Sequence, residues 1–145
     1  VYLAHMGRLL GLDVGQQRTG IATTDALHIA CSPHMTVQTS QLIDTLRDML
    51  SGSDFDGIVI GRPRLIGGGT TDSTPHIDDV ANKIRKAWPG MAIHFVDESF
   101  TSQEASAIQI QGGMKKSKRR EKGSLDAIAA SLILQRHIDA QSYNR

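Results

Sequence analysis

The sequence is short of cysteine, of aromatic residues and of long apolar runs. Its single cysteine, Cys31, excludes an internal disulfide and is consistent with a reducing compartment. No apolar stretch approaches the roughly 20 residues that span a bilayer, and no basic segment followed by an apolar one opens the chain. We therefore expect a cytoplasmic protein that does not engage a membrane.

The motifs of several enzyme classes are also missing. The chain has no Cys/His set at zinc spacing, no Gly-x-Ser-x-Gly elbow and no glycine loop that ends in Lys-Ser/Thr. These absences argue against a zinc site, acyl transfer and P-loop nucleotide binding. Cys31 stands in a strand-like Ile-Ala-Cys-Ser run without a paired histidine, so we expect a small buried hydrophobe rather than a nucleophile.

The chain of 145 residues is long enough for one domain with its own core, which we place at residues 7–140. A hairpin over about residues 8–25 and a third strand are followed by alternating helices and short buried strands. This order predicts an α/β fold with a mixed five-stranded sheet, three antiparallel strands and then parallel ones, and helices on both faces. Ser40 is expected to cap the first helix. Residues 1–6 are expected to be an expression-derived or disordered N-terminus, and residues 141–145 a tail.

The most informative stretch is Leu-Gly-Leu-Asp-Val-Gly, residues 10–15. It places Asp13 inside an apolar, strand-like run, where an unpaired carboxylate is costly. Gly11 and Gly15 leave room beside this acid for a phosphate or another backbone. The combination suggests a metal site that acts on phosphate.

Two further acids differ from the solvated majority. Glu98 stands at the carboxyl end of a predicted strand, where open α/β sheets bind ligands. Asp126 is expected in the first turn of the last helix, beside its apolar stripe. If these acids converge with Asp13, they need a hard cation, and one or two Mg²⁺ or Mn²⁺ ions would suit phosphodiester hydrolysis. Taken singly, each acid also has a purely structural explanation. Asp126 could be an acid that complements the helix dipole, and Glu98 could cap or pair at a strand end.

Positive charge is concentrated directly before Asp126, although the net charge is only +1. Such a run is either a solvated loop or a surface that holds a polyanionic backbone. We expect it to bind nucleic acid at the mouth of the acid site, with Arg18, Arg62 and Arg64 extending the surface. The cations of the run are Lys115, Lys116, Lys118, Arg119, Arg120 and Lys122.

Four motifs in this order resemble the YqgF/RuvX-type Holliday junction resolvases, also described as pre-16S rRNA nucleases. The resemblance runs from Gly7 to about Ile138. The chain departs from the family's pattern at Ser99, where Arg is usual, and at Arg62, where Leu is more usual. The motifs are Gly-Leu-Asp-Val-Gly with Arg-Thr-Gly-Ile-Ala (residues 11–22), Ile-Val-Ile-Gly-Arg-Pro (58–63), Asp-Glu-Ser-Phe-Thr-Ser-Gln-Glu-Ala (97–105) and Lys-Gly-Ser-Leu-Asp-Ala-Ile-Ala-Ala (122–130).

The resemblance implies an RNase H-like fold and a divalent-metal-dependent hydrolase with Asp13, Glu98 and Asp126 as its metal-binding set. Gly15 and Thr101 are the expected supporting residues. The implied role is maturation of the 5′ end of pre-16S rRNA in the bacterial cytoplasm, as part of ribosome biogenesis. The implied partners are nucleic acid and ribosomal precursor particles, with a monomer or a homodimer equally open.

Three alternatives stay open at this point. Branched DNA could replace RNA as the substrate, which would make the protein a four-way junction resolvase. An ATPase of the actin and sugar-kinase type shares such a phosphate turn, but that architecture needs two such domains, and only one fits this length. A non-catalytic nucleic-acid-binding module would agree with Ser99.

Overall fold

An antiparallel hairpin of β1 (Arg8–Val14) and β2 (Arg18–Thr24) forms the centre of the structure, a computed structural model that describes residues 7–52, 54–63, 74–97 and 122–143. The other elements follow in chain order: β3 (Cys31–Gln38), the 3₁₀ helix η2 (Thr39–Gln41), α1 (Leu42–Gly52), β4 (Phe55–Arg62), α2 (Thr74–Ala87), β5 (Ala92–Asp97) and α5 (Lys122–Tyr143).

The five strands form one mixed sheet in the order β3-β2-β1-β4-β5. Strands β1, β2 and β3 pair antiparallel, whereas β4 pairs parallel with both β1 and β5. The carboxyl ends of β1, β4 and β5 therefore lie at the same edge of the sheet. The predicted α/β architecture is confirmed.

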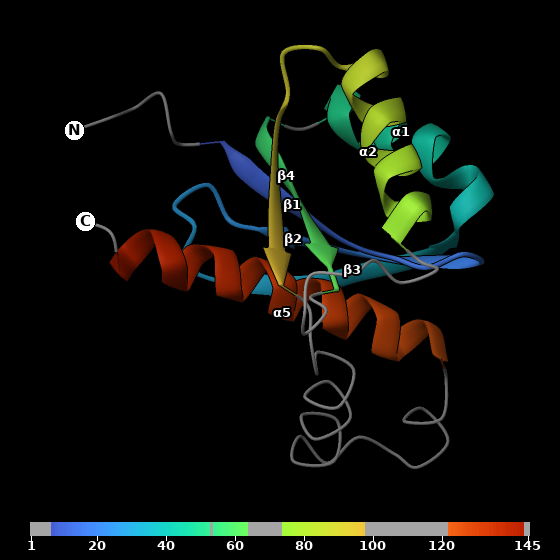
Figure 1. Ribbon diagram of the computed structural model, residues 1–145. Coiled ribbons are helices and arrows are strands. Elements are labelled where there is room, and N and C mark those ends of the chain that lie inside the picture. Colours follow the sequence, from blue (N-terminus) through green and yellow to red (C-terminus); the bar gives the residue numbers. More distant parts are fainter. Residues whose placement is uncertain (1–6, 53, 64–73, 98–121, 144–145) are drawn as a thin grey trace.

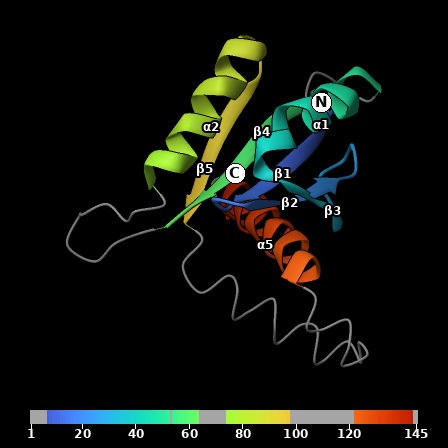
Figure 2. The same ribbon diagram turned by 90° about the vertical axis from the view of Figure 1, so that its right-hand side faces the viewer.

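The sheet lies between two helical layers, with α1 and α2 on one face and α5 on the other (Figures 1 and 2). Side chains alternate along β1, so this strand contributes to the core on both faces of the sheet. Leu10 and Leu12 belong to the core cluster formed with α1 and α2, and Leu9 belongs to the smaller cluster formed with α5. Buried isoleucines and leucines fill both clusters, so burial of apolar surface on each face stabilises the sheet.

Two local predictions are wrong. Ser40 does not cap α1, because it lies inside η2, which leads directly into the helix at Leu42. Helix α5 begins at Lys122 rather than near Ser124, so Asp126 is its fifth residue and no acid lies in its first turn. None of the helices in the described ranges is long and apolar enough to cross a membrane.

Candidate metal and nucleic-acid site

The side chain of Asp13 lies on the face of the sheet that α5 covers. Gly11, two residues earlier on β1, is so close to α5 that an added Cβ would stand 2.5 Å from Leu134 Cγ and 2.9 Å from the Ala130 carbonyl oxygen. Because side chains alternate along a strand, Asp13 shares that face with Gly11. Asp13 is half-buried and lies near the carboxyl end of β1.

Helix α5 brings Asp126 to the same place. Leu134, Ala130 and Asp126 follow one another at four-residue intervals, so they lie along one side of the helix. Gly20 on β2 pairs with Asp13, and a Cβ on Gly20 would overlap the Asp126 carbonyl oxygen. The glycine thus lets the helix backbone touch the strand beside Asp13. The structure brings Asp13 and Asp126 together, although more than a hundred residues separate them in the sequence.

A cation lies against one of these acids, Asp126. Arg18, the first residue of β2, donates from Nε to Oδ2 of Asp126 at 2.9 Å. The two side chains are 41% and 24% exposed, so the ion pair lies at the rim of the site and not in the core. Since α5 has no acid in its first turn, a helix-dipole role does not account for Asp126.

Hydrogen bonds of Gly15 hold the turn between β1 and β2 in place. The Gly15 amide donates to the Arg18 carbonyl at 2.8 Å, and a Cβ at Gly15 would come within 2.6 Å of that same oxygen. The Gly15 carbonyl lies 2.7 Å from the Thr39 hydroxyl, which donates to it, and 3.0 Å from Nε2 of His76. A side chain at Gly15 would therefore disturb this turn. Thr39 and His76 carried no sequence signal for this contact, because both come from distant elements.

The third expected acid, Glu98, lies outside the described residues, and so does Thr101. Strand β5 ends at Asp97. The Asp97 carbonyl oxygen accepts a hydrogen bond from Arg136 of α5 at 2.7 Å. This bond ties the end of β5 to the helix that carries Asp126. Within the described ranges, no group of three or more His, Cys, Asp or Glu side chains could hold a metal ion. The described residues thus contain two of the three expected acids, Asp13 and Asp126.

Arg62, one of the cations expected to bind nucleic acid, lies on the opposite face. Its Nη2 contacts both carboxylate oxygens of Asp78 on α2, at 2.9 and 3.0 Å, and its guanidinium lies 5.2 Å from the centre of the Phe95 ring. Phe95 packs against the α1 and α2 core. Arg62 thus does not extend the surface around Asp126. Arg64, Lys115, Lys116, Lys118, Arg119 and Arg120 lie outside the described residues, and Lys122 begins α5.

Cys31 does not join the site. It is half-buried on β3, the edge strand, against the core cluster under α5. Burial, with the nearby acids Asp25 and Asp139, raises the pKa of its thiol to about 11. The thiol is therefore protonated at neutral pH, which argues against a nucleophilic role.

A protein-family model described as RuvX, Holliday junction resolvase, matches residues 7–140. The chain belongs to the RuvX family. A protein of Porphyromonas gingivalis that carries the name of pre-16S rRNA nuclease is 40% identical over 92% of this chain and 97% of its own length. A protein of Christiangramia forsetii with the same name is 40% identical over 90% of this chain and 96% of its own length.

Among solved structures, RuvC of T. thermophilus in complex with a Holliday junction substrate matches with a TM-score of 0.56 and 14% identity. The match covers 94% of this chain and 96% of the RuvC chain. At this level of identity the likeness establishes the RuvC-like, RNase H-like fold.

Proposed function

We propose that this protein is a divalent-metal-dependent endonuclease that processes the 5′ end of pre-16S rRNA. The observation that carries the proposal is the juxtaposition of Asp13 and Asp126 across Gly20, on the α5 face of the sheet. Membership of the RuvX family over residues 7–140 supports a nuclease over an ATPase or a non-catalytic module. The names of the relatives that match nearly the whole chain support RNA processing over cleavage of branched DNA.

The donor chemistry of the site suits Mg²⁺ or Mn²⁺. Carboxylate oxygens are the ligands that these hard cations prefer, and Asp13 and Asp126 present them on one face. The guanidinium on Asp126 supports the fit, since this carboxylate is placed where it binds a positive charge. We propose Asp13, Asp126 and Glu98, the residue after Asp97, as the ligands of one or two ions. A bound metal would activate water and stabilise the leaving oxygen.

The surrounding residues have separate roles in this proposal. Asp13, on the central strand, would lie between the metal positions and be the least dispensable ligand. Arg18 has a guanidinium suited to a phosphate once Asp126 no longer binds it. Lys122 and the basic run before it would hold the nucleic-acid backbone without reading its sequence.

Single-turnover cleavage of a 5′-extended 16S rRNA precursor, with Mg²⁺ or Mn²⁺, tests the proposal. We expect Asp13→Asn to lose on the order of a hundredfold or more in rate, because a weakened metal ligand removes several kcal/mol of charge stabilisation. Asp44→Asn is the matched control, since Asp44 is exposed on α1, on the other face, where it pairs with Arg47. Cleavage that survives Asp13→Asn undiminished would contradict the mechanism.

A four-way DNA junction in a parallel assay distinguishes the substrates. We expect Asp13-dependent cleavage of the RNA precursor in preference to the junction. The reverse preference would assign the protein to junction resolution, the activity by which the family model is described. ATP turnover without cleavage of either substrate would favour the ATPase alternative.

A further inference from the structure

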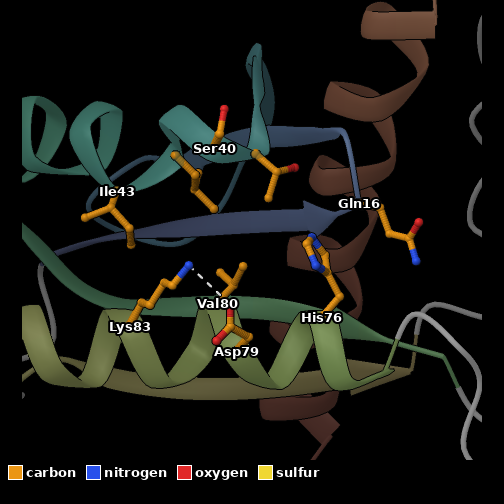
Figure 3. A pocket seen from close by; sticks show the side chains of 9 residues that line it. Gln16, Ser40, Ile43, His76, Asp79, Val80 and Lys83 are labelled. Atoms are coloured by element: carbon orange, nitrogen blue, oxygen red, sulfur yellow. Dashed lines mark ion pairs between the residues drawn. The ribbon is translucent and has the colours of Figure 1, made fainter.

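A groove of about 210 Å³ opens on the face of the sheet opposite Asp126. Figure 3 shows His76, Val80 and Lys83 of α2 pointing toward η2 and α1, where Ser40 and Ile43 form the other wall. His76, Val80 and Lys83 follow one another at helical spacing, so one side of α2 lines the groove. Gln16, in the turn between β1 and β2, closes its end.

The groove and the acid site share that turn. The groove residue His76 contacts the Gly15 carbonyl at 3.0 Å, and Gly15 is two residues after Asp13. Arg18, at the other end of the turn, pairs with Asp126 on the α5 side. A nucleic-acid strand with a phosphate at Asp13 and Asp126 would therefore reach the groove by crossing one tight turn.

The charge of the groove argues against an anionic ligand. Its cation, Lys83, pairs with Asp79 at 3.2 Å, so the two charges compensate each other. Both side chains are about 60% exposed, so they can exchange this weak contact for a ligand at little cost. Together they offer one donor and one acceptor. Aliphatic side chains of Ile43 and Val80 provide apolar walls. This mixture fits a neutral heterocycle with hydrogen-bonding edges.

The volume restricts the ligand further. A cavity of ~150 Å³ holds a benzene ring, whereas drug-sized ligands occupy ~300 Å³ or more. The groove therefore has room for one planar base and not for a duplex. Proteins that read RNA bind unstacked bases in this way, through the base edge and a planar side chain such as histidine.

We propose that this groove binds one unpaired nucleobase of the substrate strand, next to the phosphate that is cleaved. The inference rests on the proposed nuclease function, which it deepens. The groove would place a splayed nucleotide on one side of the Gly15 turn while the scissile phosphate lies on the other. It would thus select cleavage sites in single-stranded or bulged RNA.

The binding test uses metal-free ¹⁵N-labelled protein and needs no cleavage. Guanosine, adenosine, cytidine and uridine are titrated separately into the millimolar range, and the backbone amides of Ser40 and Lys83 are followed by NMR. We expect saturable shifts with at least one nucleoside and none with inorganic phosphate. An absence of shifts with all four nucleosides, or equal shifts with phosphate, would overturn the proposal.

Two tryptophan variants provide the matched comparison. Ser40→Trp places a bulky indole at the wall of the groove, and we expect nucleoside affinity to fall at least tenfold. Ser51→Trp adds the same side chain at the exposed far end of α1, away from the groove, and should bind like the wild type. Equal nucleoside affinity in both variants would contradict the assignment of the groove.

The cleavage assay separates this inference from the proposed function. If RNA cleavage depends on Asp13 and Ser40→Trp shifts the positions of the cuts, both are supported. If cleavage depends on Asp13 but its positions are the same in Ser40→Trp and Ser51→Trp, the groove proposal fails alone. If nucleosides bind but no nucleic acid is cut, the nuclease proposal fails, and the groove is not a substrate subsite.

Discussion

Arg18 and Asp126 form an ion pair of 2.9 Å that joins the first residue of β2 to the fifth residue of α5. The guanidinium neutralises one of two carboxylates that the fold holds close together. A metal ion bound by Asp13 and Asp126 would compete with Arg18 for the same oxygen. In the proposed function, the ion pair would therefore oppose metal binding.

Replacement of Arg18 tests this competition. We expect Arg18→Gln to raise the affinity for Mn²⁺ several-fold in isothermal titration calorimetry, because the metal no longer displaces a guanidinium. The metal-free variant should lose at most about 1 kcal/mol of unfolding free energy in urea, as is typical of a partly exposed pair. Arg47→Gln, which breaks an exposed pair on α1, is the control. Weaker Mn²⁺ binding by Arg18→Gln would show that Arg18 assists the metal.

The close approach of α5 to β2 predicts a steric cost at Gly20. An added Cβ would overlap the Asp126 carbonyl oxygen, so we expect Gly20→Ala to lower the unfolding free energy by about 1–3 kcal/mol. The same change should weaken Mn²⁺ binding, because it moves Asp126 away from Asp13.

Gly52→Ala provides the matched control for Gly20→Ala. No atom lies within 4 Å of a Cβ at Gly52, the last residue of α1, so this variant should keep or slightly gain stability. Urea denaturation of both variants measures the difference. Equal stability would mean that α5 does not press on β2 at this point.

Two histidines predict how stability depends on pH. The rings of His94 on β5 and His137 on α5 lie 4.6 Å apart. Burial, together with the charges of His94 and His28, lowers the pKa of His137. The unfolded chain therefore binds a proton more readily than the folded protein does. We expect stability to be highest above the ordinary histidine pKa and to fall as the pH drops toward the lowered one.

Urea denaturation at several pH values between about 8 and 5 measures this effect. His137→Phe removes the titrating group while keeping a planar ring, so its stability should change less over the same range. A slope identical to that of the wild type would assign the pH dependence to other groups.

The raised pKa of Cys31 predicts that its thiol reacts slowly with alkylating reagents. With the pKa raised to about 11, the thiolate is scarce at pH 7. We expect alkylation of the native protein to be roughly 100-fold slower than that of the urea-unfolded chain. Mass spectrometry of iodoacetamide-treated samples measures both rates. Equal rates would show that the fold does not protect the thiol. Cys31→Ala should keep full nuclease activity.

Strands β1 and β4 could be predicted from sequence because each contains a short apolar run between turn residues. The rule that sequential elements pack as neighbours accounts for the pairing of β1 with β2, β2 with β3 and β4 with β5, but β4 pairs with β1 and not with β3. The face of each residue on β4 could not be predicted. This strand is buried on both sides, so Ile58, Val59 and Ile60 form a continuous apolar run without alternation. The sequence therefore does not show that Arg62 lies on the face opposite Asp126, where it pairs with Asp78.

The acids Asp13 and Asp126 were found because each carried a local anomaly, an acid in an apolar strand and an acid beside an apolar stripe. The sequence also carries a signal for Gly20, since a glycine inside a strand often marks a site where another backbone approaches closely. Thr39 and His76 had none, because their contact with the Gly15 carbonyl exists only after three separate elements have packed.

The position of Asp126 on α5 also has a consequence for synthesis. Asp13 belongs to the first strand and Asp126 to the last described helix, so a growing chain forms the hairpin long before it contains its second acid. Domains fold as units during translation, and this helix completes one face of the sheet. The two acids of the proposed site therefore come together only when the last described helix packs on the sheet, late in the order of synthesis.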